Sequence, residues 1–301
     1  MKRIISFAVA LAALTALSTG RSHAVPGNLY VLNNTNSTIE TYTPAGSGSV
    51  FTSVGLSNAH ALAFGPDGNL YAANRGGNSI VRYTPGGAVS TFTNTGLNQP
   101  SGLAFDSSGN LYASNYGNNT IEKFTPGGVA SVFANSGLNG PVGMAFDSSG
   151  NLFVASNNGT IQKITPGGTV TQFANTVSFG GGPYDLAFDA AGNLFTTING
   201  AAKIVKYTPA GVGTLFANTL MNNPTGLAFD AAGDLFVVNF NGNTIDKFTP
   251  AGVGSVFASS GLSGPVDIVF DNSTAVPEPA SLAVLGTGLV GFAAMRRRRA
   301  A

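Results

Sequence analysis

The sequence predicts an all-β protein, a six-bladed β-propeller whose blades are four-stranded antiparallel sheets. A unit of 41 or 42 residues recurs six times, and its copies begin at Gly27, Gly68, Gly109, Gly150, Gly192 and Gly233. Each copy holds four short segments rich in aromatic and aliphatic residues, and two phenylalanine positions recur in every copy. Four strands per roughly 40 residues is the sequence signature of a propeller blade.

The third copy shows how one blade is built. Its four strand-like segments are Asn110–Ser114, Thr120–Thr125, Ala130–Ala134 and Gly143–Asp147. Runs of this length between clusters of Gly, Pro, Asn and Ser are typical of strands. The connections are turns. In TPGG at 125–128 the Pro has the φ that a turn needs and the Gly tolerates positive φ. The turn DSSG at 106–109 begins with Asp and ends with Gly, as turns often do.

Twelve of the 21 phenylalanines lie in two strict columns. The first column is Phe64, Phe105, Phe146, Phe188, Phe229 and Phe270, and the second is Phe51, Phe92, Phe133, Phe173, Phe216 and Phe257. Large apolar rings are what blade-to-blade packing requires, because each blade buries both faces against its neighbours. The same burial explains why the GLAF-type segments are apolar throughout rather than alternating. Small residues beside the first column, such as Gly102 and Gly143, suit a strand near a crowded central axis.

The two ends of the repeat array predict how the ring closes. The first copy has no innermost strand before it, and the sixth copy finishes on the strand PVDIVFD at 265–271, which has no following copy. We therefore expect Val266–Asp271 to complete the first blade beside Asn28–Leu32, so that no blade stays open. A β-solenoid is the lesser alternative, because its coils usually repeat over fewer residues.

Residues 1–24 have the composition of a signal peptide. Lys2 and Arg3 precede an apolar run over 4–17, and Ser22-His23-Ala24 is a small-x-small cleavage site. The apolar run is short for a membrane span. We therefore expect export and a mature chain that begins at Val25.

Residues 25–274 are expected to form the propeller as one domain. The sequence contains no cysteine, so the stability of the exported chain must come from packing and ring closure rather than from disulfides. Residues 25–276 carry seven basic and twelve acidic side chains, a net charge of −5. A slightly acidic body without a basic patch argues against nucleic-acid binding.

Residues 275–301 change composition abruptly. Pro277-Glu278-Pro279 is followed by 16 uncharged residues and then by Arg296, Arg297, Arg298 and Arg299. A helix over 280–295 would be about 24 Å long, and the arginine stems would extend its reach across a bilayer. We expect a transmembrane helix with its arginines on the cytoplasmic side and the propeller outside. A buried C-terminal helix is the alternative.

This tail, VPEPASLAVLGTGLVGFAAMRRRR, resembles the PEP-CTERM sorting signal of Gram-negative, biofilm-forming bacteria. It has the three parts of that signal in order: the motif, the apolar span and the basic end. The resemblance implies an exosortase-type processing enzyme as a partner and cleavage near the Pro-Glu-Pro motif. It also implies that an inner-membrane-anchored precursor yields a protein of the cell surface or of an exopolysaccharide matrix.

The body resembles an NHL-type propeller, through PSGLAFDSSGNLYASNYGNNTIEKFTP at 100–126 and its copies. That scaffold hosts enzymes, receptors and binding modules alike. Within the superfamily, the gluconolactonase-like and streptogramin-lyase-like branches are enzymes with a divalent cation in the central channel, and the lyase branch also uses a histidine. The mature chain has one histidine, His60, with no acidic residue obviously paired to it. We interpret His60 as a channel-rim or packing residue.

Two acidic residues stand out on the predicted innermost strands. Asp185 and Asp267 occupy a column that is otherwise Gly or Ala. One interpretation is a Ca²⁺ site, in which these carboxylates join the side-chain oxygens of asparagines that end neighbouring strands. Those asparagines are Asn33, Asn74, Asn115 and Asn239. The other interpretation is that the carboxylates are solvated at a channel mouth and the asparagines terminate strands by bonding to the backbone.

A basic column recurs on the predicted third strand. It consists of Arg82, Lys123, Lys163, Lys206 and Lys247, with Glu40, Glu122 and Asp246 as neighbours. We interpret it as a solvated outer wall on which opposite charges alternate.

The near-identity of the blades favours a binding role over catalysis. An enzyme site needs different residues at one place, and such asymmetry is confined to His60, Tyr184, Asp185 and Asp267. We predict an exported, non-catalytic binding module whose partner is extracellular polysaccharide or another surface protein. Tyr116, Tyr184 and Phe240 are candidates for stacking on sugars or for packing. The competing prediction is a metal-dependent, lactonase-like hydrolase or lyase that uses the central channel, with Asp185 and Asp267 as metal ligands.

Overall fold

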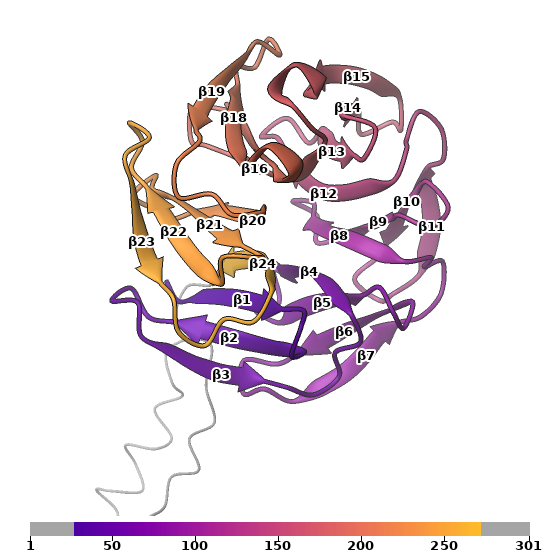
Figure 1. Ribbon diagram of the computed structural model, residues 1–301. Coiled ribbons are helices and arrows are strands. Elements are labelled where there is room, and N and C mark those ends of the chain that lie inside the picture. The colour runs from indigo at the N-terminus through magenta and orange to yellow at the C-terminus, as the bar shows by residue number, and fades with distance from the viewer. Residues whose placement is uncertain (1–26, 272–301) are drawn as a thin grey trace, which may run out of the picture.

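The computed structural model describes residues 27–271, which form a ring of six four-stranded antiparallel sheets around a central channel (Figure 1). The predicted all-β, six-bladed propeller is confirmed. The predicted signal peptide at 1–24 and the predicted transmembrane helix within 275–301 lie outside the described residues. Within the described part of the chain, no helix is long and apolar enough to cross a membrane.

Each blade contributes one strand to each of four concentric positions. The innermost strands are β4 (Ala59–Phe64), β8 (Pro100–Phe105), β12 (Pro141–Phe146), β16 (Pro183–Phe188), β20 (Pro224–Phe229) and β24 (Pro265–Phe270). The second strands are β5 (Leu70–Asn74), β9 (Leu111–Asn115), β13 (Leu152–Ser156), β17 (Leu194–Ile198), β21 (Leu235–Asn239) and β1 (Leu29–Asn33). The third strands are β6 (Ser79–Tyr83), β10 (Thr120–Phe124), β14 (Thr160–Ile164), β18 (Lys203–Tyr207), β22 (Thr244–Phe248) and β2 (Thr38–Tyr42). The outermost strands are β7 (Val89–Thr93), β11 (Ala130–Ala134), β15 (Val170–Asn175), β19 (Gly213–Ala217), β23 (Gly254–Ala258) and β3 (Gly48–Thr52). Of two 3₁₀ turns, η1 (Val177–Phe179) lies between β15 and β16 and η2 (Asn199–Ala201) lies between β17 and β18.

The last strand closes the ring as predicted. The sheet order β24-β1-β2-β3 defines blade 1, and blades 2 to 6 follow in chain order from β4. Strand β24 pairs antiparallel with β1, with Leu29 opposite Phe270 and Val31 opposite Ile268. The amide of Gly27 donates to the carbonyl oxygen of Asp271 over 2.8 Å, so the two ends of the described chain lie side by side. Residues 27–271 therefore contain every strand that the closed ring needs.

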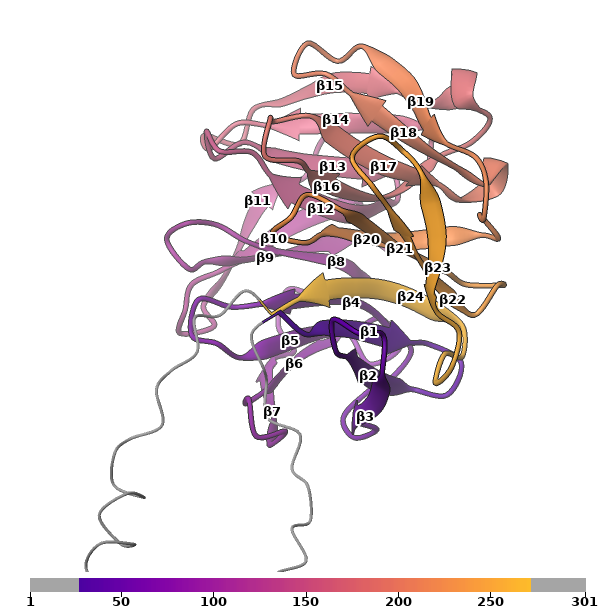
Figure 2. The same cartoon turned by 90° about the vertical axis from the view of Figure 1, so that its left-hand side faces the viewer.

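The ring has two distinct faces. All innermost strands begin on one face, here called the mouth face, which also carries the turns between second and third strands. They end on the other, here called the tail face, which carries the DSSG-type and TPGG-type turns and both Gly27 and Asp271. Figure 2 shows the ring from the side, with β24 running between the two faces. Whatever follows Asp271 in the chain therefore leaves from the tail face.

Aromatic triplets connect neighbouring blades. The ring of Tyr112, on the second strand of blade 3, lies edge-on to Phe133 of its own blade at 4.9 Å and to Phe146 of blade 4 at 5.0 Å. The two predicted phenylalanine columns thus meet through a third aromatic column: Tyr30, Tyr71, Tyr112, Phe153, Phe195 and Phe236. Edge-to-face pairs of this kind contribute about 0.5–1.5 kcal/mol beyond their buried area.

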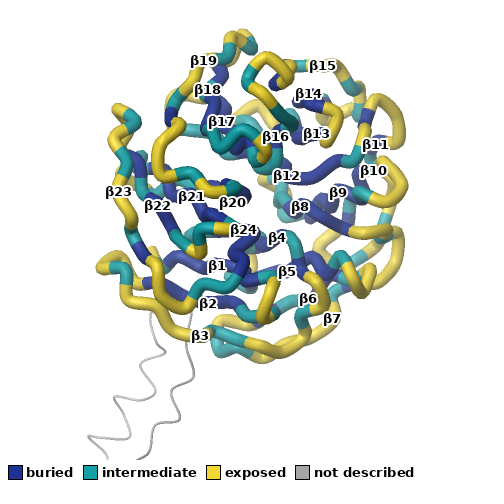
Figure 3. The backbone as a smooth tube through the Cα atoms, in the orientation of Figure 1, coloured by how far each residue is buried: buried dark blue, intermediate teal, exposed yellow. Residues whose placement is uncertain are grey.

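Exposure increases outward across each blade (Figure 3). The second strands are buried, whereas the outermost strands present side chains such as Val50 and Val132, each more than half exposed. The basic column does not form the solvated wall of alternating charges that we expected. Lys123 lies 3.9 Å from Asp106 and over the ring of Tyr112 at 5.3 Å. The neighbouring Glu122 is buried, and burial raises the pKa of its carboxyl.

Candidate binding site at the channel mouth

The innermost strands are irregular close to the mouth face. The pairing register of β8 with β9 shifts between Pro100 and Gly102, and that of β16 with β17 shifts between Pro183 and Leu186. A bulge of this kind inserts a residue, interrupts the ladder and re-aims side chains. Here it turns the residues that differ among blades toward the axis of the ring.

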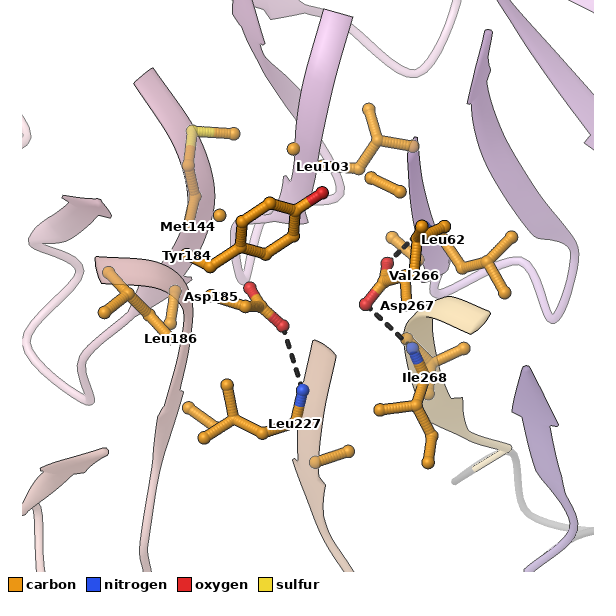
Figure 4. Close-up of a pocket in the computed structure, with 18 of the residues that line it drawn as sticks. Leu62, Leu103, Met144, Tyr184, Asp185, Leu186, Leu227, Val266, Asp267 and Ile268 are labelled. Carbon is orange, nitrogen blue, oxygen red and sulfur yellow. Dashed lines mark hydrogen bonds between the residues drawn. The ribbon is translucent and has the colours of Figure 1, made fainter. Parts of the chain in front are cut away.

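The central channel contains a cavity of about 390 Å³, lined by innermost strands of all six blades. All four predicted channel candidates line it: His60, Tyr184, Asp185 and Asp267. Figure 4 shows the carboxylates of Asp185 and Asp267 facing each other, with the ring of Tyr184 beside them. Ring closure thus brings together side chains that lie up to 207 residues apart in sequence, the separation of His60 and Asp267.

Each carboxylate accepts hydrogen bonds from the backbone of the next blade. An oxygen of Asp185 accepts from the amide of Leu227 at 3.2 Å, and one of Asp267 accepts from the amide of Leu62 at 2.6 Å. The second oxygen of Asp267 accepts from the amide of Ile268 at 2.8 Å. These amides lie next to the bulges, where ladder pairing is interrupted. The two aspartates therefore satisfy backbone donors that would otherwise lack partners.

Burial governs the ionisation of this pair. Burial raises the pKa of Asp185 to about 7. Hydrogen bonds from the amides of Leu186 and Leu227 favour the charged form and lower the pKa, but their effect is smaller. Burial also raises the pKa of Asp267 well above its usual range, and the negative charge of Asp185 adds to that effect. Two carboxyls that face each other in a desolvated channel hold at least one proton near neutral pH.

The pair predicts that the protein loses stability as the pH rises from about 4 to about 7. In the unfolded chain an aspartate releases its proton near pH 4, whereas Asp185 in the folded protein holds it up to about 7. Since the folded state binds more protons in this window, the free energy of unfolding should fall by about 1.4 kcal/mol per pH unit for each proton that only the folded state holds. Urea unfolding at pH 5, 6 and 7 measures this slope. The double variant Asp185→Asn/Asp267→Asn should flatten it, and an unchanged slope would assign the effect to other groups.

A hydrogen bond spans the channel above the carboxylates. The hydroxyl of Tyr184, on blade 5, lies 3.3 Å from Nδ1 of His60, on blade 2, which is the opposite blade of the ring. Burial, and then the charge of Arg75, lowers the pKa of His60 to about 4. Burial and the nearby carboxylates raise the pKa of Tyr184. At neutral pH the tyrosine therefore keeps its proton and the imidazole is neutral.

The asparagines of the predicted metal site lie elsewhere. The side-chain oxygens of Asn74, Asn115 and Asn239 accept from backbone amides of the loops that enter the blades, at 2.9–3.0 Å. None of the three lines the channel cavity. Over residues 27–271, no group of three or more His, Cys, Asp or Glu side chains is arranged to hold a metal ion. The two carboxylates would supply only part of the six to eight oxygens that Ca²⁺ takes, and the asparagine oxygens do not complete the set.

A second set of blade-specific residues surrounds the mouth face, and sequence reasoning singled out only Tyr116 and Phe240 from it and missed the other four. These residues directly follow the asparagine column: Asn34, Arg75, Tyr116, Asn157, Asn199 and Phe240. The guanidinium of Arg75 stacks over the ring of Tyr116 at 4.2 Å, and the amide of Asn157 donates to the Tyr116 hydroxyl at 3.4 Å. The available signal was the variability of this one position among otherwise repeated copies.

Comparison with known families supports the fold and the sorting signal. The model of the virginiamycin B lyase family matches residues 50–274, and the model of the PEP-CTERM protein-sorting motif matches residues 275–299. The sequence matches none of the curated proteins with which it was compared.

Several solved structures share the architecture at low sequence identity. A chain of a nidogen–laminin complex is 21% identical, with a TM-score of 0.71 over 80% of this chain and 97% of that one. A catalytically inactive histidine-to-alanine variant of virginiamycin B lyase from Staphylococcus aureus, solved with quinupristin, is 20% identical, with a TM-score of 0.65 over 85% and 92%. A protein described as a putative gluconolactonase is 16% identical, with a TM-score of 0.58 over 78% and 82%. At these identities the likeness shows the fold alone.

Proposed function

Since the chain belongs to the virginiamycin B lyase family and carries a PEP-CTERM protein-sorting motif, we propose that it is an exported, surface-sorted binding module without catalytic activity. Its ligand is an extracellular polysaccharide, bound at the mouth face. The PEP-CTERM motif implies processing by an exosortase. In the inner-membrane-anchored precursor the chain continues from the tail face, so the mouth face points away from the anchor.

The observation that carries this proposal is the position of the blade-specific side chains. The aromatic columns, turns and ion pairs repeat from blade to blade, whereas the residues around the channel opening differ. Arg75 and Tyr116 form a stacked pair there, with Asn157 bonded to the tyrosine. Repetition serves the scaffold, and the asymmetric end of the channel is where selectivity for a ligand would be encoded.

The chemistry of this ring suits sugars. Tyrosine and phenylalanine rings offer flat apolar faces, and asparagine and arginine side chains donate hydrogen bonds to hydroxyl groups. Tyr116 and Phe240 are both partly exposed on the mouth face. A neutral or acidic sugar chain fits this surface better than a nucleic acid does, because Arg75 is the only basic residue among the six blade-specific residues that follow the asparagine column.

The state of His60 supports binding over catalysis. With its pKa lowered to about 4, this imidazole is a weak base at neutral pH. Its Nδ1 is already hydrogen-bonded to the Tyr184 hydroxyl, and the neighbouring carboxylates accept from backbone amides. The imidazole of His60 is therefore poorly suited to take a proton from a substrate at neutral pH.

The proposal predicts that Tyr116→Ala weakens polysaccharide binding about three- to tenfold, because a stacked aromatic contributes about 0.5–1.5 kcal/mol. Retardation of residues 25–276 in gels that contain the polysaccharide of a biofilm matrix measures the affinity. Val132→Ala, an exposed change on the outermost strand of the same blade, serves as the control and should bind like the unaltered protein. Equal retardation of both variants would remove the mouth face as the binding site.

Family membership favours one competing function, a lyase that opens cyclic ester or lactone substrates in the channel. The S. aureus enzyme is catalytically inactive once a histidine is replaced, and His60 is the only histidine of the mature chain. Incubation of residues 25–276 with quinupristin and millimolar Mg²⁺ tests this function. Turnover that disappears in His60→Ala would establish the lyase and overturn the non-catalytic role.

A further inference from the structure

The tail face carries a groove between neighbouring blades that occurs in at least three equivalent copies. The groove between blades 4 and 5 has a volume of about 610 Å³, and those between blades 6 and 1 and between blades 2 and 3 have volumes of about 250 and 160 Å³. We call these three the interblade grooves. In the first of them, the lining includes Phe153, Phe173, Phe188, Pro209, Asp147 and Lys163. All six positions of the repeat recur in the groove between blades 6 and 1, whereas the groove between blades 2 and 3 shares the aromatic and proline positions but not the Asp and Lys.

Aromatic rings form the floor of each groove. Phe153 is buried and lies edge-on to Phe173 at 4.9 Å and to Phe188 at 5.1 Å. Phe173 and Phe188 are themselves partly exposed, and they come from neighbouring blades. The packing that holds two blades together therefore leaves ring surface open to solvent at the bottom of the groove.

The charged groups at the rim neutralise each other. Nζ of Lys163 lies 3.9 Å from a carboxylate oxygen of Asp147 and 5.3 Å from the centre of the Phe153 ring. In the groove between blades 6 and 1, Lys247 lies 3.8 Å from Asp230 and 2.8 Å from Asp234. Because the ammonium is already paired, the groove presents hydrogen-bond donors and acceptors beside apolar rings without an uncompensated cation. This combination favours a neutral polyhydroxylated ligand over an anion.

The three grooves occupy every second blade interface, so they are spaced evenly around the ring. A polymer of repeated units can occupy more than one such site, and linked binding events raise the overall affinity by about 10²–10⁴ over that of one site. A small monomeric ligand would gain nothing from the repetition.

We propose that the interblade grooves bind hexose rings of a neutral polysaccharide, as a set of sites distinct from the channel mouth. The apolar face of a sugar ring packs on Phe173 and Phe188, and its hydroxyls bond to Asp147 and Lys163. The inference takes the class of partner from the proposed function, but its sites lie on the opposite face of the ring.

The test replaces the rim ammonium and keeps the floor. In Lys163→Met/Lys247→Met the side chains still cover the aromatic rings, so folding is preserved, and two grooves lose a donor. The matched control is Lys123→Met/Lys206→Met, which removes the same ion pair and ring contact at positions that line none of the three grooves. The probes are dextran, mannan and a galactan, with polygalacturonate as the charged comparison, in affinity gels and by calorimetry on residues 25–276.

We expect at least one neutral polymer to bind, with affinity reduced tenfold or more in the groove variant and unchanged in the control. Its short oligosaccharides should bind at least a hundredfold more weakly than the polymer. Binding that is lost in Tyr116→Ala and unaffected in the groove variant would overturn the proposal that the grooves bind sugar, and it would support binding at the mouth face. Loss in the groove variant alone would do the reverse. No binding to any neutral polymer, or stronger binding to polygalacturonate, would also overturn the grooves.

Discussion

A chain cut after Gly264 is expected not to fold. This truncation removes β24, whose pairing with β1 is, among the strands of residues 27–271, the only sheet pairing that joins the two ends of the repeat array. It also removes Val266 and Ile268, both buried, and leaves the second strand of blade 1 with an open edge. With no cysteine in the chain, no disulfide offsets the lost closure.

Far-UV circular dichroism and size-exclusion chromatography of residues 25–264 and 25–274 test this expectation. The longer chain retains β24 and should be a monomeric, cooperatively unfolding β-protein. The shorter chain should aggregate or lack a cooperative transition. A folded, monomeric 25–264 chain would show that five complete blades and a three-stranded blade 1 suffice for folding.

The second large effect is expected for Gly143→Ala, on the innermost strand of blade 4. A Cβ at this position would lie 2.5 Å from the Cα of Asp185 on the next blade and would also overlap its carboxylate. The obstructing atoms include backbone, so relief requires the ring to widen. Overpacking of this kind costs about 3 kcal/mol at the upper end of its usual range, which corresponds to a Tm lower by roughly 6–12 °C in a domain of this size.

Gly200→Ala is the matched control, because nothing lies within 4 Å of a Cβ built at that glycine. Its Tm should stay within about 2 °C of that of the unaltered protein. Differential scanning calorimetry of the two variants measures the contrast. Equal Tm values would contradict this prediction, because they would mean that the innermost strands can accommodate a methyl group between Gly143 and Asp185.

Most of the fold could be predicted from the sequence because the chain is built from a repeat. Its period, its turn residues and its two phenylalanine columns predicted six blades, and the last strand of the sixth copy predicted ring closure by Val266–Asp271. Strand ends in the third copy differ from the prediction by no more than two residues, as for Pro141–Phe146 against 143–147. Local patterns suffice here because each blade buries the same side chains in the same way.

The candidate site was predictable only in part. The break in the small-residue column pointed to Asp185 and Asp267, and the structure places both in one cavity with Tyr184 and His60. The asparagines looked equivalent as oxygen donors, but their side chains bond to entry loops. Which way an amide at a strand end faces depends on the loop of the preceding blade, and no pattern within one repeat encodes that.

By itself, the sequence determined the architecture, the closure of the ring and the sorting motif, because these depend on periodicity and on composition. Only the tertiary structure decided which side chains meet across the ring. The bridge between Tyr184 and His60, the pairing of two carboxylates from blades 5 and 1, and the grooves between blades all join residues whose separation in sequence carries no signal. Closing six repeats around one axis sets those distances.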